Sequence, residues 1–182
     1  LSEPCIERVQ RGEADFALTA ENPDYADLDY DAIASDPFVL LLPEGHALAR
    51  RRTRGLSWAE VAELPHISMP ARTSVRQYAD EAFLALGRRF APRWEVEHLA
   101  TINAMVADGL GVAALPALAA LVARGSRVVQ RPLTEPVVRR PVGLVRPKGR
   151  RLSTAARAVA EALQAAVREA LAAGAGTDGR IR

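Results

Sequence analysis

Two points of the sequence combine hydroxyl side chains with the expected start of a helix, where an anion can bind. Arg72-Thr73-Ser74 precedes one amphipathic stretch, and Thr101 precedes another. The first amides of a helix lack intrahelical partners and carry a partial positive charge, so they can hold a carboxylate without any catalytic group. Arg72 or Arg76 could add a bidentate contact to that carboxylate. Ser74 and Thr101 could equally serve only as N-caps, and capping does not exclude ligand contact.

Motifs that characterise enzymes are missing from this sequence or lie in the wrong context. There is no Gly-x-Ser-x-Gly elbow, Cys-x-x-Cys pair, His-Glu-x-x-His motif or phosphate-binding loop. The run Gly109-Leu-Gly-Val-Ala-Ala114 matches a dinucleotide fingerprint, but its glycines end a helix and open a strand, whereas the fingerprint needs the strand first. His46, His66 and His98 are far apart, which favours turn or strand-surface positions over metal ligation. We therefore predict a binding protein that is not an enzyme and uses neither a metal nor a cofactor.

The stretch from Thr101 to Pro116 predicts a short helix followed at once by a buried strand. Its helical part carries an apolar stripe, formed by Ile102, Met105 and Val106. Thr101 is the expected N-cap, and Gly109 can adopt the left-handed conformation that ends a helix. The apolar run at 111–115 is typical of a strand that is covered on both faces.

Helices and strands alternate along the rest of the chain. Capping-box patterns begin two of the helices, at Ser57-Trp-Ala-Glu60 and at Ser74-Val-Arg-Gln77. The expected helices cover 2–11, 57–64, 74–87, 117–123 and 153–172, the strands cover 14–19, 38–42, 66–69, 94–98, 128–133 and 138–145, and 20–31 is an expected loop. Strands separated by helices predict an α/β fold with a mostly parallel sheet.

Composition indicates an ordinary globular domain. The chain has 182 residues, of which 49% are hydrophobic and 25% are charged. No apolar run is long enough for a membrane helix, and the N-terminus lacks the pattern of a signal peptide. The single cysteine, Cys5, agrees with a reducing compartment and is expected to be a small buried helix residue. A cytoplasmic location follows as the expectation, with no contact to a membrane.

Charge is distributed unevenly along the sequence. Residues 1–31 hold nine acidic and two basic side chains, whereas residues 124–151 hold nine basic and one acidic. A basic stretch of this density could contact phosphates. Because its arginines alternate with Val, Leu and Pro and almost no aromatic residue lies among them, a solvated face is the favoured interpretation.

Three stretches in this order and spacing resemble the effector-sensing domain of LysR-type transcriptional regulators. One is the helix-to-strand stretch at 101–116. The second, Val9 to Thr19, resembles the family's helix end, Gly-Glu turn and apolar strand. The third, Asp36 to Ala49, is similar to the strand that leaves the first subdomain and the Pro-x-x-His-x-Leu turn that follows it.

The resemblance implies a type-2 periplasmic-binding-protein-like fold, in which two α/β lobes are joined by a hinge of two crossing strands. On that basis, residues 1–38 and 134–182 form the first lobe and 39–133 form the second. The tail at 174–182 is expected to be disordered. Compared with the family, two strands and a helix are missing from the start of the first lobe, which leaves open whether the sequence is truncated or divergent.

The resemblance also implies where an effector binds and with what the protein assembles. In the family, the loop that matches Met69 to Ser74 faces the ligand cleft, and its hydroxyls and amides contact the effector. Thr19, which follows the matching strand of the first lobe, is a further candidate. Family members are homodimers or homotetramers, and DNA contact is expected only through an N-terminal winged helix-turn-helix that this chain lacks.

The favoured hypothesis is therefore a small-molecule-sensing regulatory domain of a bacterial transcription factor, whose ligand changes the conformation of the DNA-bound oligomer. Two alternatives share the fold. A solute-binding protein of a transporter would carry an export signal, and an enzyme such as a dehydratase would lose turnover when Thr73, Ser74 or Arg76 is changed.

Overall fold

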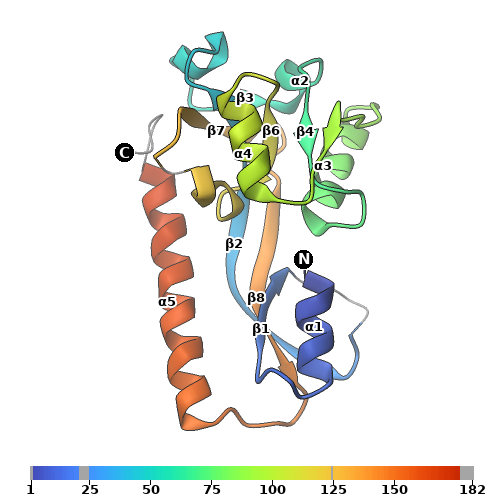
Figure 1. Ribbon diagram of the computed structural model, residues 1–182, viewed down its shortest axis with the longest axis vertical. Coiled ribbons are helices and arrows are strands. Elements are labelled where there is room, and N and C mark those ends of the chain that lie inside the picture. The colour runs from blue at the N-terminus through green and yellow to red at the C-terminus, as the bar shows by residue number, and fades with distance from the viewer. Residues whose placement is uncertain (1, 21–24, 124, 177–182) are drawn as a thin grey trace. The chain divides into compact units, whose positions relative to one another are not determined.

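The polypeptide alternates helices and strands and divides into two units (Figure 1). The computed structural model describes residues 2–20, 25–123 and 125–176. The first unit consists of Leu1–Asp36 with Arg140–Ala173, and the second of Pro37–Arg139 with Gly174–Arg182. Strands β2 (Leu28–Pro43) and β8 (Arg139–Pro147) each contribute residues to both units.

The first unit contains two helices and a short antiparallel arrangement of strands. Helix α1 (Ser2–Gln10) contacts strand β1 (Ala17–Ala20), and β1 pairs antiparallel with β8, which neighbours β2. Helix α5 (Thr154–Gly176) contributes three buried side chains, Ala156, Ala160 and Val167. Residues 174–176 are helical, and residues 177–182 of the expected disordered tail lie outside the described residues.

The predicted burial of Cys5 is wrong, because its side chain is exposed. Helix α1 places Ile6 and Val9 in the core, three residues apart on one face. Cys5 precedes Ile6 by one residue and therefore points about 100° away from it around the helix. The sequence predicted the helix and its inward residues correctly but placed the cysteine on the wrong face.

Strand β2 begins earlier than predicted. Its first part places acidic residues of the 1–31 stretch beside a basic residue of the 124–151 stretch. The predicted loop at 20–31 is strand from Leu28 onward, and residues 21–24 lie outside the described residues. Arg146 of β8 donates from Nε to Asp31 at 3.0 Å and lies 3.1 Å from a carboxylate oxygen of Asp29. The hydrogen bond to Asp31 raises the pKa of the Arg146 guanidinium. Part of the basic stretch at 124–151 is therefore paired with acidic side chains, not simply solvated.

The second unit is centred on the last part of β2. On one side β2 pairs antiparallel with β6 (Ala113–Pro116), and on the other with β7 (Val128–Thr134). Strand β3 (Leu56–Ser57) runs parallel to β7, and β4 (Ile67–Ser68) runs parallel to β5 (Trp94–Glu95). The remaining elements are α2 (Trp58–Val61), α3 (Ser74–Ala85), α4 (Leu99–Ala107) and the 3-10 helices η1 (Ala47–Arg50) and η2 (Ala119–Ala123).

The prediction of a mostly parallel sheet is wrong for the long strands. The parallel pairs are short, and helix α3 connects β4 to β5 as a βαβ unit should. The long pairs formed by β2 join segments that are far apart in the sequence, so no crossover helix dictates their direction. The alternation of elements predicted the connected pairs but carried no information about these distant ones.

Local signals along the second unit are mostly confirmed. The capping box at Ser57 is present, with Glu60 bonded back to the backbone of Ser57. Gly87 and Gly109 have φ values of +70° and +77°, as expected for residues that end helices. Only Trp94–Glu95 of the predicted 94–98 strand forms, and the predicted helix near 117–123 is the 3-10 helix η2. Within the described ranges, no helix is long and apolar enough to cross a membrane.

The core of the second unit is built on β2 and a cluster of aromatic rings. The side chains at 38–42 are all buried, as the continuous apolar run predicted. Phe83 stacks on Phe90 with ring centroids 4.5 Å apart and meets Trp58 edge-on at 5.6 Å. His66 contacts both phenylalanine rings edge-on and is only 3% exposed. Its predicted turn or strand-surface position is therefore wrong, whereas His46 does cap the turn that begins η1.

Gly111 lies where β6 and the start of β4 come very close together. A Cβ atom at this position would overlap the carbonyl oxygen of Pro65 and would lie 3.2 Å from the side chain of Ile67. We expect Gly111→Ala to lower the free energy of unfolding by about 1–3 kcal/mol, because a buried backbone would have to move. Urea denaturation would measure this. Gly45→Ala is the control, because a Cβ atom added there would meet no atom within 4 Å; equal stability of the two variants would contradict the prediction.

Burial lowers the pKa of His66 from its usual 6.5, although the hydrogen bond between Nε2 and the Val61 carbonyl oxygen opposes this. The unfolded chain therefore binds more protons than the folded chain below pH 6.5, so stability should fall as the pH falls through that range. We expect wild type to lose up to about 1.4 kcal/mol more than His66→Gln on going from neutral pH to one unit below the unfolded pKa. Urea denaturation at the two pH values measures the difference. His98→Gln is the exposed control, and an unchanged pH dependence in His66→Gln would contradict the prediction.

Candidate functional site

The loop between β4 and α3 forms a tight turn that starts the helix at Ser74. Thr73 is the N-cap, and its Oγ1 accepts from the Arg76 amide at 3.3 Å and donates to the Pro70 carbonyl at 2.8 Å. The Thr73 amide bonds to the same carbonyl at 3.0 Å. The cap is thus one residue earlier than the predicted cap at Ser74, because the turn at Pro70 holds the Thr73 hydroxyl over the first turn of α3.

Donors remain at this helix start after Thr73 has capped it. The amide of Val75, in the second position of α3, has no hydrogen-bond partner among the residues described. Ser74 opens the helix and is half-buried. Met69, at the other end of the loop, is 8% exposed and packs in the core. The loop therefore offers backbone donors beside an apolar wall.

Ser68 is a candidate that sequence analysis missed. It is the last residue of β4, it is 2% exposed, and its Oγ has no hydrogen-bond partner within the described part of the chain. A buried hydroxyl without a partner destabilises the folded protein by about 1–3 kcal/mol. The hydroxyl of Ser68, just before the loop that leads to α3, is therefore a candidate for a hydrogen bond to a ligand. The short apolar strand at 66–69 contained the available signal, a serine among core residues directly before a helix cap.

The two predicted arginines are already engaged by carboxylates. Arg72 Nη2 lies 2.5 Å from Glu97 Oε1, and both side chains are more than half exposed. Arg76 is 8% exposed; its Nε lies 2.8 Å from Asp80 Oδ1, and its Nη1 lies 2.5 Å from Glu95 Oε1. Burial acts to lower the pKa of Arg76, but the hydrogen bonds to the two carboxylates raise it. Arg72 keeps donors besides Nη2 for a ligand carboxylate, whereas at the buried Arg76 a ligand would compete with Asp80 and Glu95.

The same ion pairs connect the start of α3 to the segment that leads into α4. Glu95 and Glu97 precede α4, which begins at Leu99 with His98 as N-cap. His98 makes no side-chain capping bond, so the first amides of α4 lack the side-chain hydrogen bond that Thr73 provides to α3. Thr101 is exposed and lies in the third position of the helix, so its predicted role as N-cap is wrong. The helix starts earlier than predicted, and the partly buried Leu99, which packs against the core, is its first residue.

Thr19 belongs to the first unit and has a similar character to Ser68. It lies in β1 opposite Gly143 of β8, it is 4% exposed, and its Oγ1 has no hydrogen-bond partner among the described residues. Thr19 in the first unit and Ser68 in the second thus both carry a buried hydroxyl that the described residues leave unsatisfied. The sequence pointed to Thr19 only through the resemblance.

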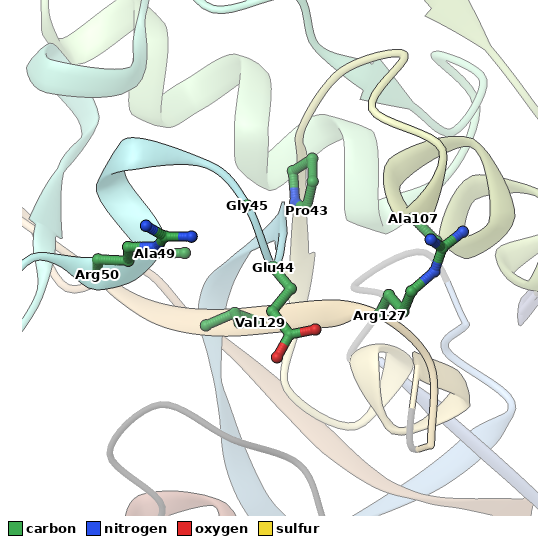
Figure 2. Close-up of a pocket in the computed structure, with 8 residues that line it drawn as sticks. All are labelled: Pro43, Glu44, Gly45, Ala49, Arg50, Ala107, Arg127 and Val129. Atoms are coloured by element: carbon green, nitrogen blue, oxygen red, sulfur yellow. The ribbon is translucent and has the colours of Figure 1, made fainter.

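A separate pocket of about 610 Å³ in the second unit contains none of the predicted site residues. Glu44, Arg50 and Arg127 supply its charged lining, together with small and apolar residues (Figure 2). The polar groups of the α3 loop and the volume of this pocket therefore suggest two different locations for a ligand. The α3 loop, with its helix amides and a buried hydroxyl, has the more specific binding groups of the two.

Comparisons with known proteins support a regulator. Residues 1–168 match the family described as the LysR substrate binding domain. The chain is 36% identical over 154 residues to the uncharacterized HTH-type transcriptional regulator YfeR of Shigella flexneri, a match that covers 85% of this chain and 49% of the relative. The chain spans about half the length of the curated relatives that it matches.

Solved structures show the same fold at low sequence identity. The CcmR regulatory domain of Synechocystis PCC6803, in complex with 2-PG, has a TM-score of 0.75 and 22% identity, covering 90% of this chain and 78% of that one. The effector binding domain of QuiR, in complex with shikimate, has a TM-score of 0.76 and 17% identity, covering 92% of this chain and 78% of that one. The predicted type-2 periplasmic-binding-protein-like α/β fold is confirmed. The chain belongs to the family of LysR substrate-binding domains, as the stretches at 9–19, 36–49 and 101–116 predicted.

Proposed function

We propose that this chain is the effector-sensing domain of a bacterial LysR-type transcription factor and that it binds a small carboxylate without breaking any bond in it. The observation that carries the proposal is the pair of buried hydroxyls of Ser68 and Thr19, one in each unit, without hydrogen-bond partners among the described residues. Bound shikimate and 2-PG in two proteins of the same fold support a ligand of this size and polarity.

The residues predicted for the site take different roles in this proposal. Thr73 shapes the loop through its cap, while Ser74 and the Val75 amide offer polar contacts at the helix start. Met69 supplies apolar surface. Ser68, which the sequence did not suggest, joins this group as a hydroxyl that is free to bond to a ligand.

The charged residues are proposed to act less directly. Arg72 is exposed, so exchanging Glu97 for a ligand carboxylate would cost little, because exposed ion pairs are worth about 0–1 kcal/mol. Arg76 is buried between two carboxylates and is proposed to fix the start of α3. Thr101, exposed on α4, is proposed as a further polar contact for a ligand.

The proposed mechanism is a shift in the population of conformations. A ligand changes a conformational equilibrium only when it binds one state more tightly than the other. We propose lobes at 1–38 with 134–182 and at 39–133, and a ligand whose bonds to Thr19 or to the α3 loop form in only one of the states would have that preference. The change would pass to the DNA-binding part of a cytoplasmic homodimer or homotetramer.

Removing an unsatisfied hydroxyl should weaken ligand binding without lowering the stability of the free protein. We expect Ser68→Ala and Thr19→Val to leave the melting temperature of the free protein unchanged or slightly higher, because no protein hydrogen bond is lost. The same variants should bind the effector about tenfold more weakly, which is about 1.4 kcal/mol. Thermal unfolding with shikimate, 2-PG and a panel of small carboxylates and aromatics measures both properties, since a ligand at 100 times its Kd stabilises by about 2.7 kcal/mol.

Ser126→Ala is the matched control, because its Oγ donates to the Ala123 carbonyl at 2.5 Å. This variant should melt at a lower temperature and keep the ligand-induced rise. The proposed function would be rejected if no ligand in the panel stabilised the folded wild type. The assignment of Ser68 and Thr19 would be rejected if both variants kept the full rise.

A further inference from the structure

The segment Arg50-Arg51-Arg52-Thr53-Arg54 is the densest run of positive charge in the second unit. All four arginines are exposed. Arg51 is paired with Glu60, whereas Arg50, Arg52 and Arg54 have no carboxylate partner within the part of the chain that the structure describes. Three unneutralised guanidinium groups within five residues form a surface that attracts anions.

A buried arginine holds this segment in place from below. Arg131 of β7 is 3% exposed, and its Nη1 donates to the carbonyl oxygens of Leu48 at 3.3 Å and Arg51 at 2.5 Å. Its Nη2 donates to the carbonyl oxygen of Thr53. The backbone is therefore bound at several points along the run, which limits the conformational entropy that its exposed side chains lose on binding.

Arg131 also adds to the local charge. It makes no ion pair with a carboxylate among the described residues: its Nη1 and Nη2 donate to carbonyl oxygens, and its Nε has no hydrogen-bond partner there. The potential over the segment thus includes a buried positive charge that surface residues do not cancel.

The pocket beside the segment extends the basic surface. Arg50 lines it on one side and Arg127 on the other, with Glu44 between them (Figure 2). Arg127 is exposed, and its distance of 3.8 Å from Asp108 makes only a weak pair. No aromatic side chain lines the pocket or belongs to the segment, so nothing here would stack on a nucleic-acid base.

The basic stretch that stands out in the sequence, 124–151, is a weaker candidate. Arg131 is buried, Arg140 lies 3.3 Å from a carboxylate oxygen of Asp36, and Arg146 is paired with two aspartates. Folding therefore neutralises or buries three of the arginines of that stretch. The segment at 50–54 keeps its charge available to a partner.

We propose that Arg50, Arg52 and Arg54 form a sequence-independent contact for the phosphate backbone of duplex DNA. Guanidinium groups bind phosphate oxygens bidentately, and a duplex presents about one negative charge per 1.7 Å of its axis, which suits several arginines at once. The relatives are HTH-type regulators, so a duplex is the polyanion that such proteins meet. This inference departs from the expectation that DNA is contacted only through a separate N-terminal segment, and it is independent of the effector site.

The test compares two variants of this chain that lose the same charge. Arg50→Gln, Arg52→Gln and Arg54→Gln are combined in one, which spares Arg51 because of its pair with Glu60. Arg150→Gln, Arg151→Gln and Arg157→Gln are combined in the other, at exposed positions of the first unit. Fluorescence anisotropy with a short duplex of arbitrary sequence gives the affinity at several salt concentrations, and circular dichroism verifies that each variant is folded.

We expect the 50–54 variant to bind at least tenfold more weakly at low salt. Its plot of log K against log salt should be shallower by about 2.7, since each lost phosphate contact removes about 0.9 from the slope. The 150–157 variant should retain most of the affinity and slope. Equal losses in the two variants, or no binding of the duplex by wild type at low salt, would overturn the proposal.

Two further arms identify other anions. Inorganic phosphate that saturates the protein at low millimolar concentration and displaces the duplex would indicate a small-anion site in the pocket, which would overturn the duplex assignment. Polyglutamate that binds as tightly as the duplex would indicate an acidic protein partner and would overturn it as well. Weak competition by both supports the proposal.

Discussion

The hydrogen bonding of strand β2 is the constraint on which the other elements depend. In the second unit, β2 is bonded to β6 on one side and to β7 on the other, and its apolar residues 39–42 are buried in the core. In the first unit, the same strand neighbours β8. Between these two regions lies Asp36, fully buried and paired with Arg140 at 3.3 Å. Breaking a buried pair by removing one partner typically costs about 3–5 kcal/mol, so this charge pair fixes the position of both strands where they pass from one unit to the other.

What the sequence predicted well is what local chemistry decides. The apolar runs at 38–42 and 111–115 are buried and lie in β2 and in or just before β6, the capping box at Ser57 is formed, and Gly87 and Gly109 end helices with positive φ. What it predicted poorly depends on distant partners. The first half of β2 has only a short apolar alternation, at 28–31, and is strand where β8 lies beside it. The site shows the same limit: the helix start at 73–74 was found to within one residue, whereas the unpartnered state of Ser68 is visible only once its neighbours are placed.

Charge pairing explains why the proposed site would bind a ligand through neutral groups. The arginines beside the α3 loop are bonded to Asp80, Glu95 and Glu97, so they connect two helix starts instead of waiting for an anion. The donors that remain are amides and hydroxyls, whose dipoles bind an anion with smaller desolvation costs than a bare charge would. Arg50, Arg52 and Arg54 differ from them, because they are exposed and have no carboxylate partner among the described residues. The second unit therefore has paired arginines beside the α3 loop and three unpaired ones on the 50–54 segment.

An unsatisfied buried hydroxyl is a stable feature of a fold only where something offsets its cost. Ser68 and Thr19 each occupy a buried position at which an apolar side chain would make the free protein more stable by about 1–3 kcal/mol. A ligand that bonds to one of them gains that energy as affinity, because the penalty disappears on binding. A ligand that can reach such a hydroxyl in only one conformation gains that energy in that conformation alone. On the proposed function, these hydroxyls would thus supply both the affinity and the free energy that shifts the conformational equilibrium.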